Sequence, residues 1–341
     1  MSAEPLASVL VPTHDHGPTL RHSVAAALGQ TVSELEVLIV GDGMPAAAAE
    51  VARELVATDG RVRLFEFEKG ERHGEAHRHT VLEDEARGRF VLYLSDDDLW
   101  MPEHAERMTA ALEQADFVAS TAVMVLADGS FGVVPHDLSR PETRALMLTE
   151  PRHYNRVGLS VAGHTLAAYR RREQGWSPAP AGLWTDLHFW RGFVADESFT
   201  CRSLDRVTVL NFASPVRAEV DATTRAAELE AWAKRISEPG GREAVDAGID
   251  AAYRANAVVQ DLEYRKTHDW LLDAQRLAGD LGGRGDRLEL EAARSHAQVV
   301  ALEAHVRRLE ALPELRLRRS RLGRAALAAW ARLRRPRERR G

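Results

Sequence analysis

Cysteine is almost absent from this sequence, since Cys201 is alone among 341 residues. A single cysteine excludes an internal disulfide and any zinc cluster built on several cysteines. Long apolar runs are absent too, because no segment reaches the ~18 residues that a membrane helix needs. Residues 1–5 have neither the positive charge nor the long apolar stretch of a secretory signal. These absences predict a soluble, cytoplasmic protein.

Charge is unevenly distributed along the chain, whose net charge is −6. Residues 313–341 contain eleven Arg and two Glu, a balance of +9, so the first 312 residues carry −15. The negative charge of the first 312 residues argues against a protein that binds nucleic acid over its whole surface, and no nucleic-acid partner is expected. The length of 341 residues and the hydrophobic fraction of 45% allow about two domains with ordinary cores.

Strand and helix patterns alternate through the first third of the chain. Short apolar runs predict strands at residues 7–11, 35–40, 62–67 and 90–94. Helical spacing of apolar residues predicts helices at residues 20–28, 46–57, 77–86 and 102–115. Further strands are predicted at 117–126 and 207–212, a helix at 184–193, and helices after about 222. Strands separated by helices are typical of a parallel sheet covered on both faces, so the fold class is α/β.

Polar groups follow three of the predicted strands. Thr13-His14-Asp15 follows the first strand, Asp42 ends the second, and Asp96-Asp97-Asp98 follows the fourth. Because ligands bind at the carboxyl ends of strands in such sheets, these groups are expected to converge on one edge. The three adjacent carboxylates would suit Mg²⁺ or Mn²⁺. A helix N-cap is the alternative, and the spacing assigns Asp98 to that role.

Five short motifs in order resemble family 2 glycosyltransferases of the GT-A fold, over about residues 6–216. The motifs are Pro12-Thr13-His14-Asp15, Val37-Leu38-Ile39-Val40-Gly41-Asp42-Gly43, His77-Arg78-His79, Ala86-Arg87-Gly88-Arg89-Phe90, and Tyr93-Leu94-Ser95-Asp96-Asp97-Asp98-Leu99-Trp100-Met101-Pro102. The resemblance implies a mostly parallel sheet flanked by helices, followed here by a C-terminal helical extension. It also implies that Asp97 holds Mn²⁺ or Mg²⁺.

The resemblance further implies a site for a nucleoside diphosphate sugar of UDP or dTDP type. Asp42 would accept a hydrogen bond from the base, or alternatively be an Asx-turn residue. His14 would stack on the base, and Arg78 would pair with the diphosphate unless it is a solvated helix residue. The other residues implied on the donor side are Pro12, Thr13 and Asp96.

A catalytic base is implied by the segment Leu183-Trp184-Thr185-Asp186, which resembles the acidic motif of the family. Asp186 would take the proton of the acceptor hydroxyl; without the resemblance it would be interpreted as a helix cap. His164 would lie on the acceptor side, with a core histidine as the equal alternative. Three tryptophans could line an acceptor pocket, although core packing is their default role: Trp176, Trp184 and Trp190.

The implied activity is transfer of one sugar, with inversion, to a glycan or lipid-linked hydroxyl. The membrane spans and Q-x-x-R-W motif of the family's processive synthases are absent from the sequence. Five positions depart from the family pattern, namely His14, Asp15, Gly41, Ser95 and Thr185. These departures leave one alternative, a catalytically inactive GT-A scaffold that uses its helical tail to bind partners.

Four parts are predicted along the chain. They are a glycosyltransferase domain at 1–220, a helical region at 221–281, a heptad-patterned helix at 286–312 and a basic amphipathic tail at 313–341. The heptad pattern suits a coiled coil in a homodimer or a helix packed on its own body. The tail suits peripheral binding to an anionic surface at the inner face of the membrane. The alternatives are a solvated tail and a contact with nucleic acid or an acidic protein.

Overall fold

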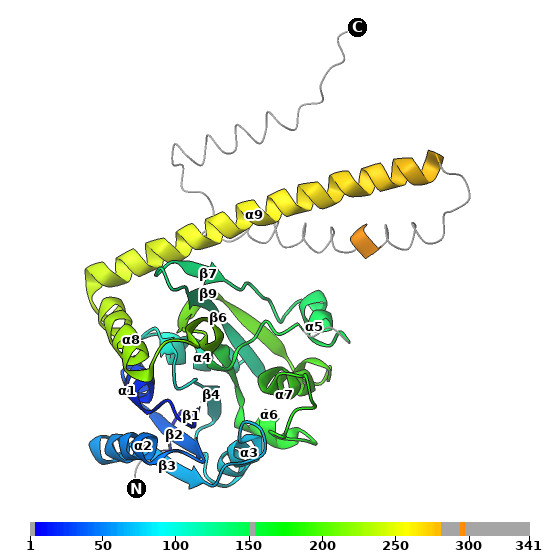
Figure 1. Ribbon diagram of the computed structural model, residues 1–341. Coiled ribbons are helices and arrows are strands. Elements are labelled where there is room, and N and C mark those ends of the chain that lie inside the picture. Colours follow the sequence, from blue (N-terminus) through cyan, green and yellow to red (C-terminus); the bar gives the residue numbers. More distant parts are fainter. Residues whose placement is uncertain (1–3, 151–153, 281–293, 297–341) are drawn as a thin grey trace. The chain divides into compact units, whose positions relative to one another are not determined.

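The computed structural model describes residues 4–150, 154–280 and 294–296 (Figure 1). The chain divides into two compact units, residues 1–252 and 253–341, and the boundary falls within the long helix α9, Pro239–Asp280. The predicted domain boundary at 220 stays a prediction. Apart from residues 294–296, which are helical, the heptad-patterned segment 286–312 and the tail 313–341 lie outside the described residues.

One mixed sheet of nine strands organises the described part of the first unit. Its order is β3-β2-β1-β4-β8-β6-β9-β5, with β7 paired to the side of β6. The strands are β1 Ala7–Thr13, β2 Leu35–Asp42, β3 Val62–Phe67, β4 Phe90–Tyr93, β5 Leu99–Trp100, β6 Phe117–Val125, β7 Phe131–Val133, β8 Ala162–Thr165 and β9 Cys201–Asn211. β1 to β4 pair in parallel, as the sequence predicts, whereas β8 inserts antiparallel between β4 and β6.

Helices cover this sheet, which confirms the predicted α/β class (Figure 1). The helices before α9 are α1 Gly17–Leu28, α2 Ala46–Thr58, α3 Glu75–Asp84, α4 His104–Leu112, α5 Pro141–Met147, α6 Leu166–Arg171, α7 Thr185–Val194 and α8 Ala222–Ser237. Two short 3₁₀ turns are Leu159–Val161 and Ser214–Arg217. Helix α1 contacts both α2 and α8. The contact between α1 and α8 brings the start of α8 close to the end of β1.

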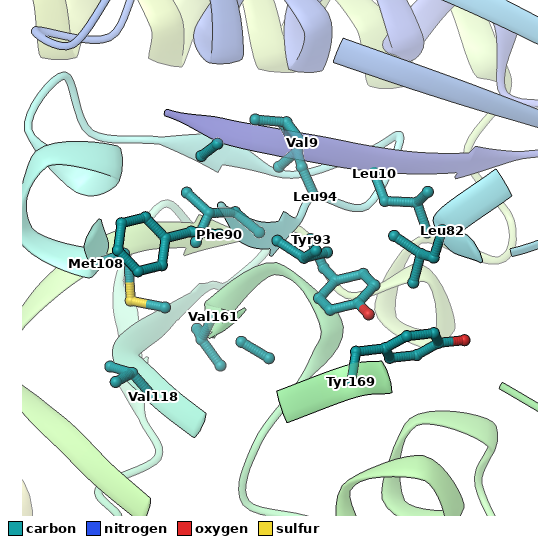
Figure 2. Packing of buried hydrophobic residues seen from close by; sticks show 14 of the residues in the cluster. Val9, Leu10, Leu82, Phe90, Tyr93, Leu94, Met108, Val118, Val161 and Tyr169 are labelled. Carbon is teal, nitrogen blue, oxygen red and sulfur yellow. The ribbon is translucent and has the colours of Figure 1, made fainter. Parts of the chain in front are cut away.

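The core combines aliphatic side chains with aromatic ones, among them Phe90, Tyr93 and Tyr169 (Figure 2). Tyr93, the last residue of β4, makes edge contacts with Trp176 and Trp190 at ring distances of 5.6 and 5.4 Å. Trp190 is fully buried and stacks on Phe117 of β6. Trp176 and Trp190 are therefore core residues, and Trp184, which is 56% exposed, is the remaining surface tryptophan of the three.

His164 of β8 lies inside this aromatic cluster and is fully buried. Its Nε2 lies 2.6 Å from the Tyr93 hydroxyl, which itself accepts a hydrogen bond from Trp176 Nε1. Its Nδ1 lies 3.0 Å from the carbonyl of Thr165. A neutral ring that donates from Nδ1 and accepts at Nε2 satisfies every one of these contacts. Burial lowers the pKa of His164 to about 3.

We expect His164 to make the protein sensitive to mild acid. An unfolded histidine gains its proton near pH 6.5, while the folded one stays neutral down to about 3. Stability is therefore complete above pH 6.5 and falls as the pH drops below it, by up to about 1.4 kcal/mol per pH unit for this group. Urea unfolding between pH 7.5 and 5 measures the slope. His164→Gln, which does not titrate, should reduce this slope without removing it, because burial also lowers the pKa of His104 to about 3. An unchanged slope would contradict the assignment.

Candidate functional site

A cleft of about 250 Å³ opens at the carboxyl ends of β1, β2 and β4. Its walls come from the three segments that the sequence predicts to meet at this edge, together with the loop before α3. The lining residues include Pro12, Thr13, His14, Asp15, His16, Asp42, Lys69, Arg72, His73, Gly74, Arg78, Ser95 and Asp96. The predicted convergence on one sheet edge is therefore confirmed.

Asp42 ends β2 at the floor of this cleft and is 6% exposed. Its carboxylate accepts hydrogen bonds from Lys69 Nζ at 2.5 Å and from the backbone N–H of Gly70 at 2.6 Å. Burial alone would raise the pKa of Asp42, but these donors hold it below its usual range. Gly74 has a φ of +71°, and a Cβ there would lie 2.7 Å from Cγ of Asp42. The loop is thus built to close tightly around this carboxylate.

The same loop gives the cleft a positively charged wall. Lys69, Arg72 and Arg78 all line it. Arg72 adopts a φ of 55° and donates to the carbonyls of Ala179 and Pro180, so it ties this wall to the loop before α7. Such a wall suits a phosphate-bearing ligand.

Arg78 lies on α3 and is 7% exposed. It donates to the carbonyl of His73 at 2.9 Å and lies over the Trp176 ring at 4.9 Å. Burial lowers its pKa, and Glu75, Asp186 and Asp42 are among the acidic groups that oppose this effect. Arg78 is therefore a buried cation, and the solvated-helix alternative is wrong.

The end of β1 supplies a polar strip beside Asp42. Pro12 and Thr13 line the cleft, and Thr13 is 4% exposed. His14 is exposed, and its Nδ1 lies 2.7 Å from the carbonyl of Asp42. The ring is thus held beside Asp42 in the lining of the cleft.

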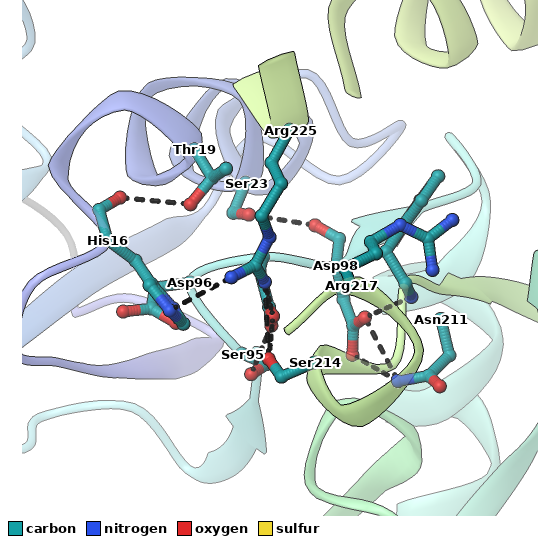
Figure 3. A network of polar contacts seen from close by, with 12 residues as sticks. His16, Thr19, Ser23, Ser95, Asp96, Asp98, Asn211, Ser214, Arg217 and Arg225 are labelled. Carbon is teal, nitrogen blue, oxygen red and sulfur yellow. Dashed lines mark hydrogen bonds and ion pairs between the residues drawn. The ribbon is translucent and has the colours of Figure 1, made fainter. Parts of the chain in front are cut away.

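A candidate cation-binding group lies after the ends of β1 and β4 (Figure 3). One ligand atom each from His16, Asp96 and Asp97 lies within 4.8 Å of the others, and two carboxylates with one imidazole suit a divalent ion such as Mn²⁺. His16 Nδ1 lies 3.0 Å from Asp96 Oδ1. The guanidinium of Arg225, from α8, lies 2.6 Å from Asp97 Oδ2. Asp97 is 5% exposed and lies behind the cleft lining.

Asp98 points away from this group, into the protein. It accepts hydrogen bonds from Asn211 Nδ2 at 3.0 Å and from the Ser160 hydroxyl at 2.5 Å. Burial, together with the neighbouring Asp97, raises the pKa of Asp98 to about 7. Helix α4 begins at His104 without a side-chain cap. The predicted capping role of Asp98 is therefore wrong, because the carboxylate joins β9 to β4 instead.

Asp186 lies in the first turn of α7 and is half-buried. Its carboxylate accepts hydrogen bonds from Asn155 Nδ2 at 2.9 Å and from the N–H of Leu187 at 2.8 Å. Burial raises the pKa of Asp186, against these donors and Arg78. Beside it, the Thr185 hydroxyl donates to the buried Glu75 at 2.8 Å. Asp186 does not line the cleft. Its carboxylate interacts electrostatically with Arg78, which does line the cleft.

Residues 8–174 match the family model described as glycosyl transferase family 2. The matched segment, residues 8–174, is a glycosyl transferase family 2 domain. Among curated relatives, the uncharacterised glycosyltransferase EpsJ of Bacillus subtilis is 29% identical over 110 residues, 32% of this chain and 31% of EpsJ. Chondroitin synthase of Pasteurella multocida is 31% identical over 102 residues, 30% of this chain and 10% of the synthase. The matches thus span less than half the length of these relatives.

A solved structure of Staphylococcus aureus TarS 1-349 is also similar. It superposes with a TM-score of 0.47 at 15% identity and covers 89% of this chain and 90% of TarS 1-349. Within this family 2 domain, His164 does not line the cleft, although the sequence places it on the acceptor side. Its position in the core, described above, favours the alternative of a core histidine.

Several side chains of this family 2 site were not predicted from the sequence. Lys69 and Arg72 lie in an irregular loop, where no periodicity marks them. Glu75 resembles any first-turn helix carboxylate, and His16 precedes a helix like many polar residues. Arg225 lies 128 positions from the carboxylate that it contacts. Only the fold brings it there.

Proposed function

We propose that this chain transfers one sugar from a nucleoside diphosphate sugar to an acceptor hydroxyl. The observation that carries the proposal is the cleft, which combines a buried carboxylate, Asp42, with a wall of Lys69, Arg72 and Arg78. A buried carboxylate suits the N–H of a pyrimidine base, and the basic wall suits a diphosphate. UDP and dTDP sugars carry both groups.

Asp186 would act as the general base. The acceptor oxygen attacks the anomeric carbon, a new carbon–oxygen bond forms, and the bond to the diphosphate breaks with inversion. The acceptor proton moves to the Asp186 carboxylate, whose raised pKa favours accepting it. Glu75 and Asn155 hold the start of α7, through Thr185 and Asp186 respectively.

A divalent ion would be held by His16, Asp96 and Asp97, whose donor set fits Mn²⁺. When bound, such an ion supplies Lewis-acid stabilisation of the leaving diphosphate. The chain's own residues on that diphosphate would be Arg72 and Arg78. Within the described residues, no helix is both long and apolar enough to cross a membrane.

A nucleotide-sugar screen tests the proposal. We expect UDP or dTDP sugars to raise the melting temperature of the full chain, because a ligand that binds only the folded state stabilises it. Asp42→Asn should weaken that binding by about tenfold, since one charge-assisted hydrogen bond becomes neutral. Asp59→Asn is the matched control, because Asp59 pairs only locally with Arg61.

The screen also separates the two interpretations of the chain. If no UDP, dTDP or GDP sugar shifts the melting temperature, the proposed donor site is wrong and the non-catalytic scaffold is favoured. If a sugar binds but no transfer to glycan or lipid-linked hydroxyls follows, donor binding stands without catalysis.

A further inference from the structure

Both oxygens of the Asp97 carboxylate already accept hydrogen bonds. Its Oδ1 accepts from the Ser95 hydroxyl at 2.9 Å, and its Oδ2 accepts from the Ser214 hydroxyl at 2.7 Å. Arg225 Nη2 donates to the same Oδ2 at 2.6 Å and lies 3.2 Å from the Ser214 hydroxyl. Figure 3 shows the Arg225 side chain reaching from α8 into this group, between His16 and Ser214.

Arg225 also contacts Nε2 of His16, the ring nitrogen that does not face Asp96. Its Nη1 lies 3.2 Å from His16 Nε2. A guanidinium only donates, so Nε2 is the unprotonated nitrogen in this arrangement. The proton then lies on Nδ1, which donates to Asp96 at 3.0 Å. The lone pair on Nε2 is the one that the ring could otherwise offer to a metal ion.

The guanidinium is held firmly in this place. Arg225 is 7% exposed and lies in the first turns of α8, whose N-terminus is capped by Asp221. Its Nε is buried without a hydrogen-bond partner. A buried cation needs a counter-charge, and Asp97, which is 5% exposed, supplies it.

We propose that Arg225 is a built-in cation of this site and competes with a divalent ion for it. The guanidinium contacts one carboxylate oxygen of Asp97 and Nε2 of His16, so it occupies ligand atoms on two of the three residues of the candidate metal group. A divalent ion binds only when the Arg225 side chain leaves, so the start of α8 controls metal loading. This inference rests on the proposed function, because it concerns the ion of that donor site.

Binding of Mn²⁺ alone, without any sugar, tests the competition. Free Mn²⁺ is measured by its electron paramagnetic resonance signal during titration of the full chain. Arg225→Met should bind Mn²⁺ at least about tenfold more tightly than the parent, since the competing charged hydrogen bonds are gone. Arg235→Met is the matched control, because Arg235 is an exposed arginine of the same helix that lies over Trp232. It should bind Mn²⁺ as the parent does.

Two further variants locate the effect and guard against misfolding. Adding Asp97→Asn to Arg225→Met should abolish the gained Mn²⁺ affinity. Arg225→Lys keeps a buried positive charge and should give an affinity between those of the parent and Arg225→Met, with the circular dichroism melt confirming the fold.

Equal Mn²⁺ affinities of the parent, Arg225→Met and Arg225→Lys would overturn the inference, whether all are tight or all are weak. An affinity gain that survives Asp97→Asn would overturn it too. These results are independent of the nucleotide-sugar screen, so the proposed transfer and the competition can fail separately.

Discussion

Asp186→Asn is expected to lower kcat by at least about 100-fold while leaving donor affinity nearly unchanged. The amide keeps the shape of the side chain and can still accept from the N–H of Leu187, so α7 should fold as before. It cannot take the acceptor proton. Steady-state kinetics on an identified acceptor, with donor binding measured by titration, separates the two effects.

Asp196→Asn is the control for this variant. Asp196 follows the same helix and accepts from the N–H of Ser198 on an exposed turn. Its replacement should leave kcat unchanged. A near-normal kcat in Asp186→Asn would reduce Asp186 to a residue that holds the first turn of α7 and Asn155 together.

Trp190→Ala is expected to cost about 3–5 kcal/mol of the free energy of unfolding. Trp190 is fully buried, stacks on Phe117 with ring centroids 5.2 Å apart, and donates from Nε1 to the carbonyl of Val157 at 3.0 Å. Truncation leaves both a cavity and an unpaired carbonyl. Urea unfolding followed by circular dichroism measures the loss.

Trp184→Ala makes the same chemical change six residues earlier. Because Trp184 is 56% exposed, its removal should change the free energy of unfolding by less than about 0.5 kcal/mol. Similar losses of unfolding free energy in the two variants would show that burial does not determine how much each tryptophan stabilises the protein.

The β1–β4 half of the fold could be predicted because its strands are continuous apolar runs. β3, for example, spans Val62–Phe67 in both the prediction and the structure. β8, Ala162–Thr165, was not predicted because its sequence, Ala-Gly-His-Thr, is too short and too mixed to show a strand pattern. It exists because β4 and β6 pair with it on either side. Two-residue β5, Leu99–Trp100, depends on β9 in the same way.

The site could be predicted where its residues lie at or just after strand ends, since strand ends are visible in the sequence. Asp42 is the last residue of β2, and Asp96 follows the end of β4 at Tyr93. The rest depends on long-range packing. Asp98 was assigned to a cap because its partner Asn211 lies 113 positions away. Arg225 reaches Asp97 only because α8 packs on α1. The roles of the heptad segment 286–312 and the tail 313–341 stay predictions.

The pairing of β6 with β9 has a consequence for how the chain is made. Phe117 of β6 pairs with Cys201, 84 residues later, and Leu99 of β5 pairs with Leu210. At about 5–20 residues per second, a ribosome takes about 4–17 s to deliver that partner. Until then β6 has an open, apolar edge in the nascent chain, where pairing with another chain competes. A fragment cut at residue 174, where the family match ends, would keep that edge permanently.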